Sequence, residues 1–83
     1  MKNPRPQGNF GKVIKHLKPL RDGDAGELRV GIIERDGERR LDIRYFSKTE
    51  RYTGPTKRGI SLSAEEFDAL KAQQKKIIRL LLK

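Results

Sequence analysis

Cysteine is absent from this chain of 83 residues, and histidine occurs only at His16. Without cysteine the chain has no disulfide framework, no thiolate metal site and no cysteine nucleophile. A single histidine does not make a histidine-rich metal site, and we interpret His16 as a solvent-facing strand residue among lysines. The motifs of zinc peptidases, serine hydrolases and phosphate-binding loops are also absent. We therefore expect no metal, no cofactor, no catalytic residue and no small-molecule substrate, and we predict that the protein is not an enzyme.

Long apolar segments are lacking as well. The longest apolar run is Leu80–Leu82, and the N-terminal residues lack the apolar core of a signal peptide. We expect neither membrane insertion nor export. The expected location is the cytoplasm, in association with the nucleoid, if the protein is bacterial, and the nucleus if it is eukaryotic.

Hydrophobic residues are scarce, at 34% against 37% charged residues. A chain of this size and composition buries little apolar surface, so we expect one domain with a thin core and a partner chain that covers part of its surface. Residues 1–9 combine prolines, a glycine and cations, which is typical of a flexible basic arm. The folded domain is expected over residues 10–83.

Positive charge is in excess, because 20 Lys and Arg outnumber 11 Asp and Glu and give a net charge of +9. Such a balance indicates a phosphate-rich or otherwise acidic partner. Residues 39–58 concentrate the pattern, with seven cations, two acids and three aromatic residues. Cations follow a phosphodiester backbone, and exposed rings stack on unpaired bases, each contact contributing roughly 1–3 kcal/mol. This segment therefore predicts binding to single strands.

Three segments have the alternation of strands, at residues 28–33, 41–46 and 59–62. The apolar spacing over residues 10–20 fits a helix about as well as a strand, and we favour a strand because Gly11, Pro19 and the β-branched pair Val13-Ile14 disfavour a helix. The turn-forming residues 21–26 separate this strand from the one at 28–33, and Asp36-Gly37 is typical of a type I′ turn between the strands at 28–33 and 41–46. The polar residues 47–58 are expected to form a loop.

Residues 64–82 are predicted to form one helix after the last strand. Ser63 and Glu66 have the spacing of a capping box, and Leu62 and Phe67 have that of a hydrophobic staple. The helix carries an apolar stripe that we expect to form a homodimer interface, made of Phe67, Leu70, Ile77, Ile78 and Leu81. The alternative is that this stripe packs only within its own chain.

Alternation along the third strand divides its side chains between two faces. If Leu41, Ile43 and Tyr45 face the helix, the open face carries Arg40, Asp42, Arg44 and Phe46, with Arg29 and Arg35 on the neighbouring strand. Asp42 either holds Arg44 in place for a phosphate or forms an ordinary surface ion pair with it. Phe46 either stacks on bases or is covered by a loop or a partner chain.

Two motifs carry a family resemblance: L-D-I-R-Y-F at residues 41–46 and K-R-G-I-S-L-S-A-E-E-F-D-A-L-K at residues 57–71. Together they resemble the DNA-binding domain of the positive cofactor four transcriptional coactivator family, which includes small bacterial members. The resemblance implies an α+β fold with a curved four-stranded antiparallel sheet and one C-terminal helix (ββββα), dimerised through the helices around a channel for single-stranded or melted DNA. It also implies that Arg44, Lys57 and Arg58 contact the DNA backbone, that Phe46 stacks on bases, and that Lys12 matches a first-strand lysine.

The sequence thus predicts a non-enzymatic, homodimeric protein that binds single-stranded DNA and acts as a transcriptional coactivator or regulator. Its expected partners are single-stranded or melted DNA, a second copy of the chain and the transcription machinery. The residues predicted to bind nucleic acid are Lys12, Arg29, Arg35, Arg44, Phe46, Arg51, Tyr52, Lys57 and Arg58. Two alternatives stay open: an interaction module whose basic sheet docks an acidic transcription partner, and a binder of single-stranded RNA.

Overall fold

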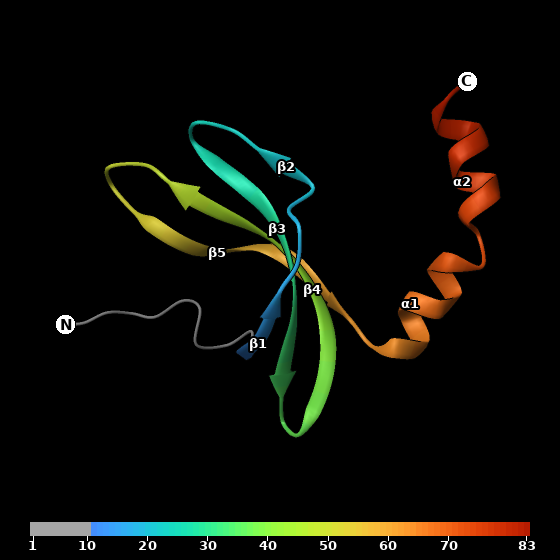
Figure 1. Cartoon of the computed structure of the whole chain (residues 1–83), viewed down its shortest axis with the longest axis horizontal. Helices are drawn as coiled ribbons and strands as arrows, with labels where there is room; N and C mark the ends of the chain where they lie inside the picture. The colour runs from blue at the N-terminus through green and yellow to red at the C-terminus, as the bar shows by residue number, and fades with distance from the viewer. Residues whose placement is uncertain (1–10) are drawn as a thin grey trace.

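The computed structural model describes residues 11–83 as a curved antiparallel sheet followed by two short helices (Figure 1). The elements are β1 (Lys12–His16), β2 (Arg21–Asp22), β3 (Gly26–Arg35), β4 (Glu38–Lys48), β5 (Thr53–Leu62), α1 (Ala64–Lys71) and α2 (Gln74–Leu81). The sheet order is β1-β3-β4-β5, and the short β2 pairs with β3. The antiparallel sheet and the helical C-terminus agree with the sequence prediction, but five strands and two helices replace the expected four and one. The predicted basic arm, residues 1–9, lies outside the described residues.

The hairpin of β3 and β4 is the longest paired unit of the sheet. Its strands pair from Gly26 opposite Ser47 to Arg35 opposite Glu38 without a register shift. The turn between them has φ values of 55° at Asp36 and 79° at Gly37. Positive values at both positions are those of a type I′ turn, whose twist matches that of the flanking strands. This part of the sequence prediction is confirmed.

The connection between β4 and β5 is much shorter than the sequence suggested. We expected a loop over residues 47–58, but β4 extends to Lys48 and β5 begins at Thr53. Pro55 lies within β5, although proline cannot donate a backbone hydrogen bond. β5 lies at the end of the sheet order, where one side of its backbone needs no partner, so Pro55 is accommodated there. A register irregularity opposite Arg44 and Phe46 also interrupts this pairing.

The first helix begins at the predicted capping box. The Glu66 amide donates to Ser63 Oγ at 3.1 Å, and the Ser63 amide donates to Glu66 Oε1 at 2.8 Å. The helical segment is divided at residues 72 and 73, contrary to the prediction of one helix. The Gln73 amide bonds the Leu70 carbonyl at 3.0 Å, while the Gln73 side chain donates to the Ala69 carbonyl at 3.3 Å. The side chain thus takes the acceptor that a continuous helix would offer to the amide, and the last turn of α1 tightens.

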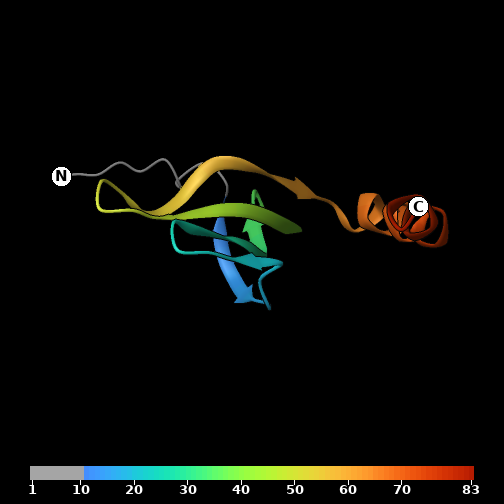
Figure 2. The same ribbon diagram turned by 90° about the horizontal axis from the view of Figure 1, so that it is seen from above.

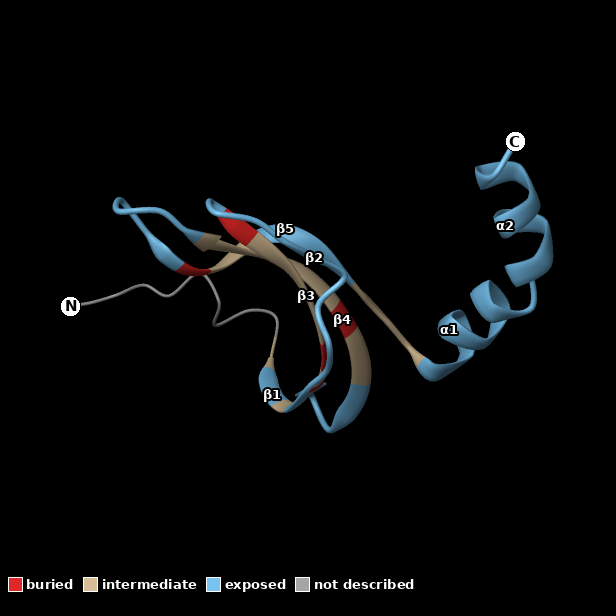
Figure 3. Ribbon diagram, turned by 45° about the horizontal axis from the view of Figure 1, so that its top comes forward, coloured by how far each residue is buried: buried red, intermediate tan, exposed pale blue. Residues whose placement is uncertain are grey.

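The helices extend beyond the sheet and do not cover it (Figure 2). Neither helix contains a buried residue (Figure 3). Within residues 11–83, Ile33 is the buried apolar side chain, at 1% exposed. Of the three residues expected to face the helix, only Leu41 lines the groove that the sheet forms with Phe67 of α1. Ile43 and Tyr45 share that face of β4 with Leu41 but do not line the groove. No helix among the described residues is long and apolar enough to span a membrane.

Candidate nucleic-acid interface

One face of the β3–β4 hairpin gathers the basic and aromatic residues that the sequence singled out. Arg29 lies opposite Arg44, and Glu27 lies opposite Phe46, so these side chains project from the same side of the sheet. Asp42 belongs to the same side by alternation. We call the sheet face that carries Arg29, Asp42, Arg44 and Phe46 the arginine face.

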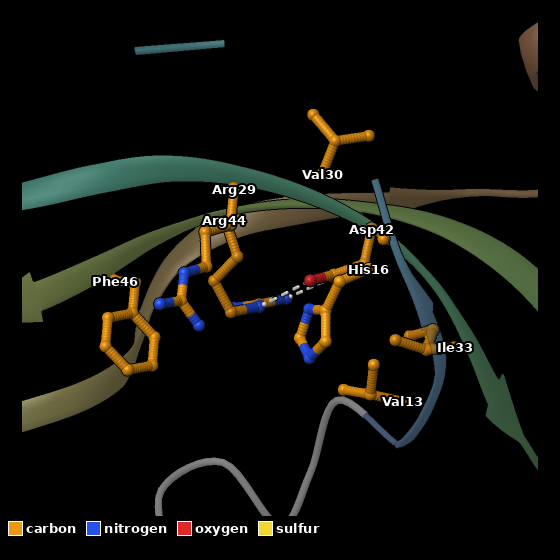
Figure 4. Close-up of a pocket in the computed structure, with 9 residues that line it drawn as sticks. Val13, His16, Arg29, Val30, Ile33, Asp42, Arg44 and Phe46 are labelled. Atoms are coloured by element: carbon orange, nitrogen blue, oxygen red, sulfur yellow. Dashed lines mark hydrogen bonds and ion pairs between the residues drawn. The ribbon is translucent and has the colours of Figure 1, made fainter. Parts of the chain in front are cut away.

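The arginine face is hollowed by a cavity of about 70 Å³. Its walls come from three strands, because Val13 and His16 of β1 join Arg29 and Ile33 of β3 and the three arginine-face residues of β4. In Figure 4 the Phe46 ring lies at one end of this cavity and Val13 and Ile33 lie at the other, with the guanidinium groups of Arg29 and Arg44 between them. The cavity is therefore apolar at its ends and cationic in its middle.

Asp42 and Arg44 form a buried pair. Arg44 donates through Nε to Asp42 Oδ2 at 3.0 Å and through Nη2 to Asp42 Oδ1 at 2.8 Å. Asp42 is only 5% exposed, so this pair is not the surface ion pair that the sequence had left as an alternative. A third bond runs from Arg44 Nη1 to the Thr56 carbonyl of β5 at 2.8 Å. Gly59 lies opposite Arg44, where a Cβ atom would approach the Arg44 Cβ to 3.0 Å, so glycine leaves room for this arginine.

Arg29 and Phe46 form a stack. The Arg29 guanidinium carbon lies 3.6 Å from the centre of the Phe46 ring, and Arg29 Nε donates to Glu27 Oε1 at 3.0 Å. The other Glu27 oxygen lies 3.5 Å from Lys48 Nζ, which also bonds Asp22 Oδ1 at 2.9 Å. The hydrogen bond to Asp22 raises the pKa of Lys48, so this amine stays charged. A chain of alternating charges thus leads from β2 to the ring of Phe46.

Arg35 and Arg40 continue the cationic surface toward the start of β4. Both donate to Ser61 Oγ of β5, at 3.3 and 3.2 Å. Arg40 also bonds Glu38 at 3.0 Å and lies 3.6 Å from Glu66, the residue of the capping box. Arg40 therefore connects the sheet to the first turn of α1.

The other predicted contacts lie elsewhere. The register places Lys12 opposite Glu34, on the face away from Arg29 and Phe46. Arg58 lies over the ring of Tyr45, with 4.9 Å from its guanidinium carbon to the ring centre, and Tyr45 also belongs to that other face. Lys57 is exposed on β5. Arg51 and Tyr52 are exposed in the β4–β5 connection, where the Tyr52 hydroxyl donates to the Pro55 carbonyl at 2.5 Å.

Sequence reasoning missed two residues of this site. His16 is an exposed strand residue, as expected, but it also lines the cavity beside Arg44 (Figure 4). Glu27 bonds Arg29 two residues ahead of it, in the same spacing by which Asp42 bonds Arg44. That repeated acid-x-Arg spacing on two strands is the sequence signal that would have indicated Glu27.

Comparison with known protein families relates the chain to one that has been described before. The family model described as Transcriptional Coactivator p15 (PC4) matches residues 24–73, more than half of the chain. The match contains the whole β3–β4 hairpin, β5 and α1, and it leaves β1 and Lys12 outside. No curated protein and no solved structure matches the chain.

Proposed function

The chain belongs to the transcriptional coactivator p15 (PC4) family of DNA-binding coactivators, and from this we propose that it is a homodimer that binds single-stranded or melted DNA in transcription. The arginine face is the observation that carries the proposal. It places two guanidinium groups and an aromatic ring around one cavity on an otherwise open sheet surface. We place this activity at the nucleoid of a bacterium or in the nucleus of a eukaryote.

The geometry favours an unpaired strand over a duplex. A protein that enters the major groove usually presents a helix or a β-ribbon with exposed polar side chains. Here the basic and aromatic groups line a hollow in a curved sheet, and the helices expose apolar residues instead. Flexible single strands can follow a curved cationic surface and turn their bases toward rings. We include Arg35, Lys57, Arg58, Arg51 and Tyr52 as peripheral contacts along this path.

The apolar side chains of the helices support a second copy as the partner. Phe67, Leu70, Ile77 and Ile78 line one groove along α1 and α2, and Leu81 is 76% exposed. Exposure of this apolar surface to water is unfavourable, and the thin core of so small a chain provides little stability to offset that cost. Self-association covers the stripe and brings two arginine faces into one particle.

A titration of fluorescein-labelled oligothymidine, followed by anisotropy at several salt concentrations, tests the proposal. We expect the logarithm of the binding constant to fall with the logarithm of salt at a slope of about −0.7 per neutralised phosphate, and we expect duplex DNA to compete poorly. Lys57→Ala lowers the magnitude of the slope by about 0.7, whereas Lys76→Ala on α2 leaves it unchanged.

Two outcomes would move the conclusion to another function. Absence of binding at low salt overturns single-strand binding and favours the docking of an acidic transcription partner on the arginine face. Tighter binding of oligouridine than of oligothymidine favours RNA as the ligand.

A further inference from the structure

The Phe46 ring, which the sequence predicted to stack on a base, already has a stacking partner. The Arg29 guanidinium carbon lies 3.6 Å from the ring centre, which is contact distance for two flat groups. We propose that the base stacks on the outer face of the Arg29 guanidinium, with Phe46 behind it, and that Glu27 is the positioning residue that holds this guanidinium flat. The inference rests on single-strand binding as proposed above.

Glu27 controls where the Arg29 guanidinium lies. Arg29 Nε donates to Glu27 Oε1 at 3.0 Å, and Glu27 lies opposite Phe46 in the β3–β4 register. The carboxylate therefore draws the guanidinium toward Phe46 and away from Arg44, its own cross-strand neighbour. Glu27 is itself fixed, because its side chain is only 17% exposed and Lys48 holds its second oxygen at 3.5 Å.

Arg29 keeps a surface for a ligand. Its side chain is 36% exposed and lines the cavity shared with His16 and Val13 (Figure 4). Among the described residues, neither of its terminal nitrogens has a hydrogen-bond partner, so both can donate to a base edge or a phosphate. A guanidinium plane is a known stacking surface for nucleic-acid bases, and one backed by an aromatic ring is already ordered before the ligand arrives.

Arg44 is less suited to this role. Its side chain is 13% exposed, and three of its N–H groups bond Asp42 and the Thr56 carbonyl. Both strands carry an acid two residues before an arginine, but only the β3 pair leaves a guanidinium face open to the cavity. Arg29 is therefore the arginine that can meet a planar group.

The charge of Glu27 gives the proposal a sharp test. An acid beside a DNA-binding surface repels phosphates, so its removal should tighten binding if it has no other role. Its removal also takes away one of the two acidic partners of Lys48, which adds to the same effect, while the bond from Lys48 to Asp22 stays. If Glu27 positions Arg29, however, Glu27→Ala weakens binding despite the gain in positive charge. The two roles predict changes of opposite sign.

The experiment measures oligothymidine affinity for the full chain and its variants at one fixed salt concentration. We expect Arg29→Lys, which keeps the charge and loses the plane, to weaken binding about fivefold or more, the low end for one stacking contact. Glu27→Ala weakens it by about three- to tenfold, and Glu27→Gln recovers part of the loss because its amide oxygen still accepts from Nε. In an Arg29→Ala background, Glu27→Ala causes no further loss.

Two matched controls separate stacking from general effects. Glu34→Ala removes an exposed acid from the face of β3 away from Arg29. Arg39→Lys repeats the arginine substitution on the same face, at the position of β4 opposite Glu34. Neither substitution should weaken binding. On an abasic deoxyribose-phosphate oligomer, Arg29→Lys should have no effect, because no base is present to stack. Circular dichroism checks folding, and if Glu27→Ala unfolds, Glu27→Gln and Arg29→Lys carry the test.

The outcomes separate the inference from the proposed function. Unchanged or tighter binding by Glu27→Ala, or an equal Arg29→Lys loss on the abasic strand, overturns the stacking role while single-strand binding stands. A wild-type protein that does not bind oligothymidine overturns both.

Discussion

At the scale of single residues, the carboxylate of Asp42 is the buried charge within residues 11–83, and Arg44 balances it through two hydrogen bonds. An ion pair of this kind contributes little net stability, yet the loss of one partner leaves a charge stranded in the interior. Arg44→Ala is therefore expected to lower the free energy of unfolding by about 3–5 kcal/mol, measured by urea denaturation. The bond to the Thr56 carbonyl is lost as well, which loosens β5.

Arg58, an exposed arginine that does not balance a buried charge, provides the control for Arg44. Arg58 lies over Tyr45 at an exposed position, where such a contact contributes about 0.5–1 kcal/mol. Arg58→Ala should therefore lower the free energy of unfolding by no more than about 1 kcal/mol. If the two substitutions had equal effects, the prediction would be wrong, because the Asp42 carboxylate would then have found another partner or water in place of Arg44.

Alternation was sufficient to place Arg40, Asp42, Arg44 and Phe46 on one face, because side chains of a strand take opposite sides in turn. The stack of Arg29 on Phe46 was beyond prediction. It depends on which residue of β3 lies opposite which residue of β4, and on a carboxylate that turns the guanidinium sideways. A sequence gives the order of residues along each strand but not these cross-strand distances.

At the scale of elements, the turn between β3 and β4 depends on a left-handed backbone at Gly37, where φ is 79°. A Cβ atom there would meet nothing within 4 Å, so the cost of a side chain is conformational alone. Gly37→Ala is expected to lower the free energy of unfolding by about 1 kcal/mol. Gly23→Ala is the matched control, because φ at Gly23 lies outside the left-handed region and the nearest atom is at an ordinary 3.5 Å.

The two glycine substitutions should have opposite signs. Alanine at position 23 removes freedom from the unfolded chain and should raise the free energy of unfolding by about 0.4–1 kcal/mol. Urea midpoints measured side by side give the comparison. A stabilising Gly37→Ala would contradict the turn geometry.

Short sequence motifs correctly predicted the turn and the helix start that they form. Asp36-Gly37 and the capping box of Ser63 and Glu66 act within a few residues, and both occur as expected. The strand over residues 53–58 was missed because Gly54 and Pro55 are turn formers, and only the position of β5 at the sheet edge makes them acceptable. The division of the helix coincides with a hydrogen bond from the Gln73 side chain to the Ala69 carbonyl, and residue type alone does not determine that side-chain conformation.

At the scale of the whole molecule, the sheet and the helices share very little interior. A groove of about 370 Å³ between them is lined by Leu17, Ile32, Leu41, Leu62 and Phe67, among others. A second groove of about 370 Å³ follows the helices through Leu70 and Ile77. Both grooves are open in the single chain. The sequence predicted a thin core, and these two exposed apolar surfaces are the counterpart of that thin core. The proposed dimer would cover both surfaces.

The apolar stripe gives the last prediction, which concerns self-association measured by sedimentation equilibrium. Ile78, 46% exposed in the single chain, lies on the stripe, whereas Leu82, 80% exposed, lies beyond the end of α2. Burial of one such side chain contributes about 1.5–3 kcal/mol, and a symmetric interface buries it twice, so Ile78→Asp should raise the dimer dissociation constant by about 100-fold or more. Leu82→Asp introduces the same charge off the stripe and should change it by less than about tenfold. Because association stabilises the folded chain by mass action, Ile78→Asp should also remove the rise of melting temperature with protein concentration. A wild-type protein that sediments as a monomer, or equal effects of the two substitutions, would place the dimer contact elsewhere or exclude it.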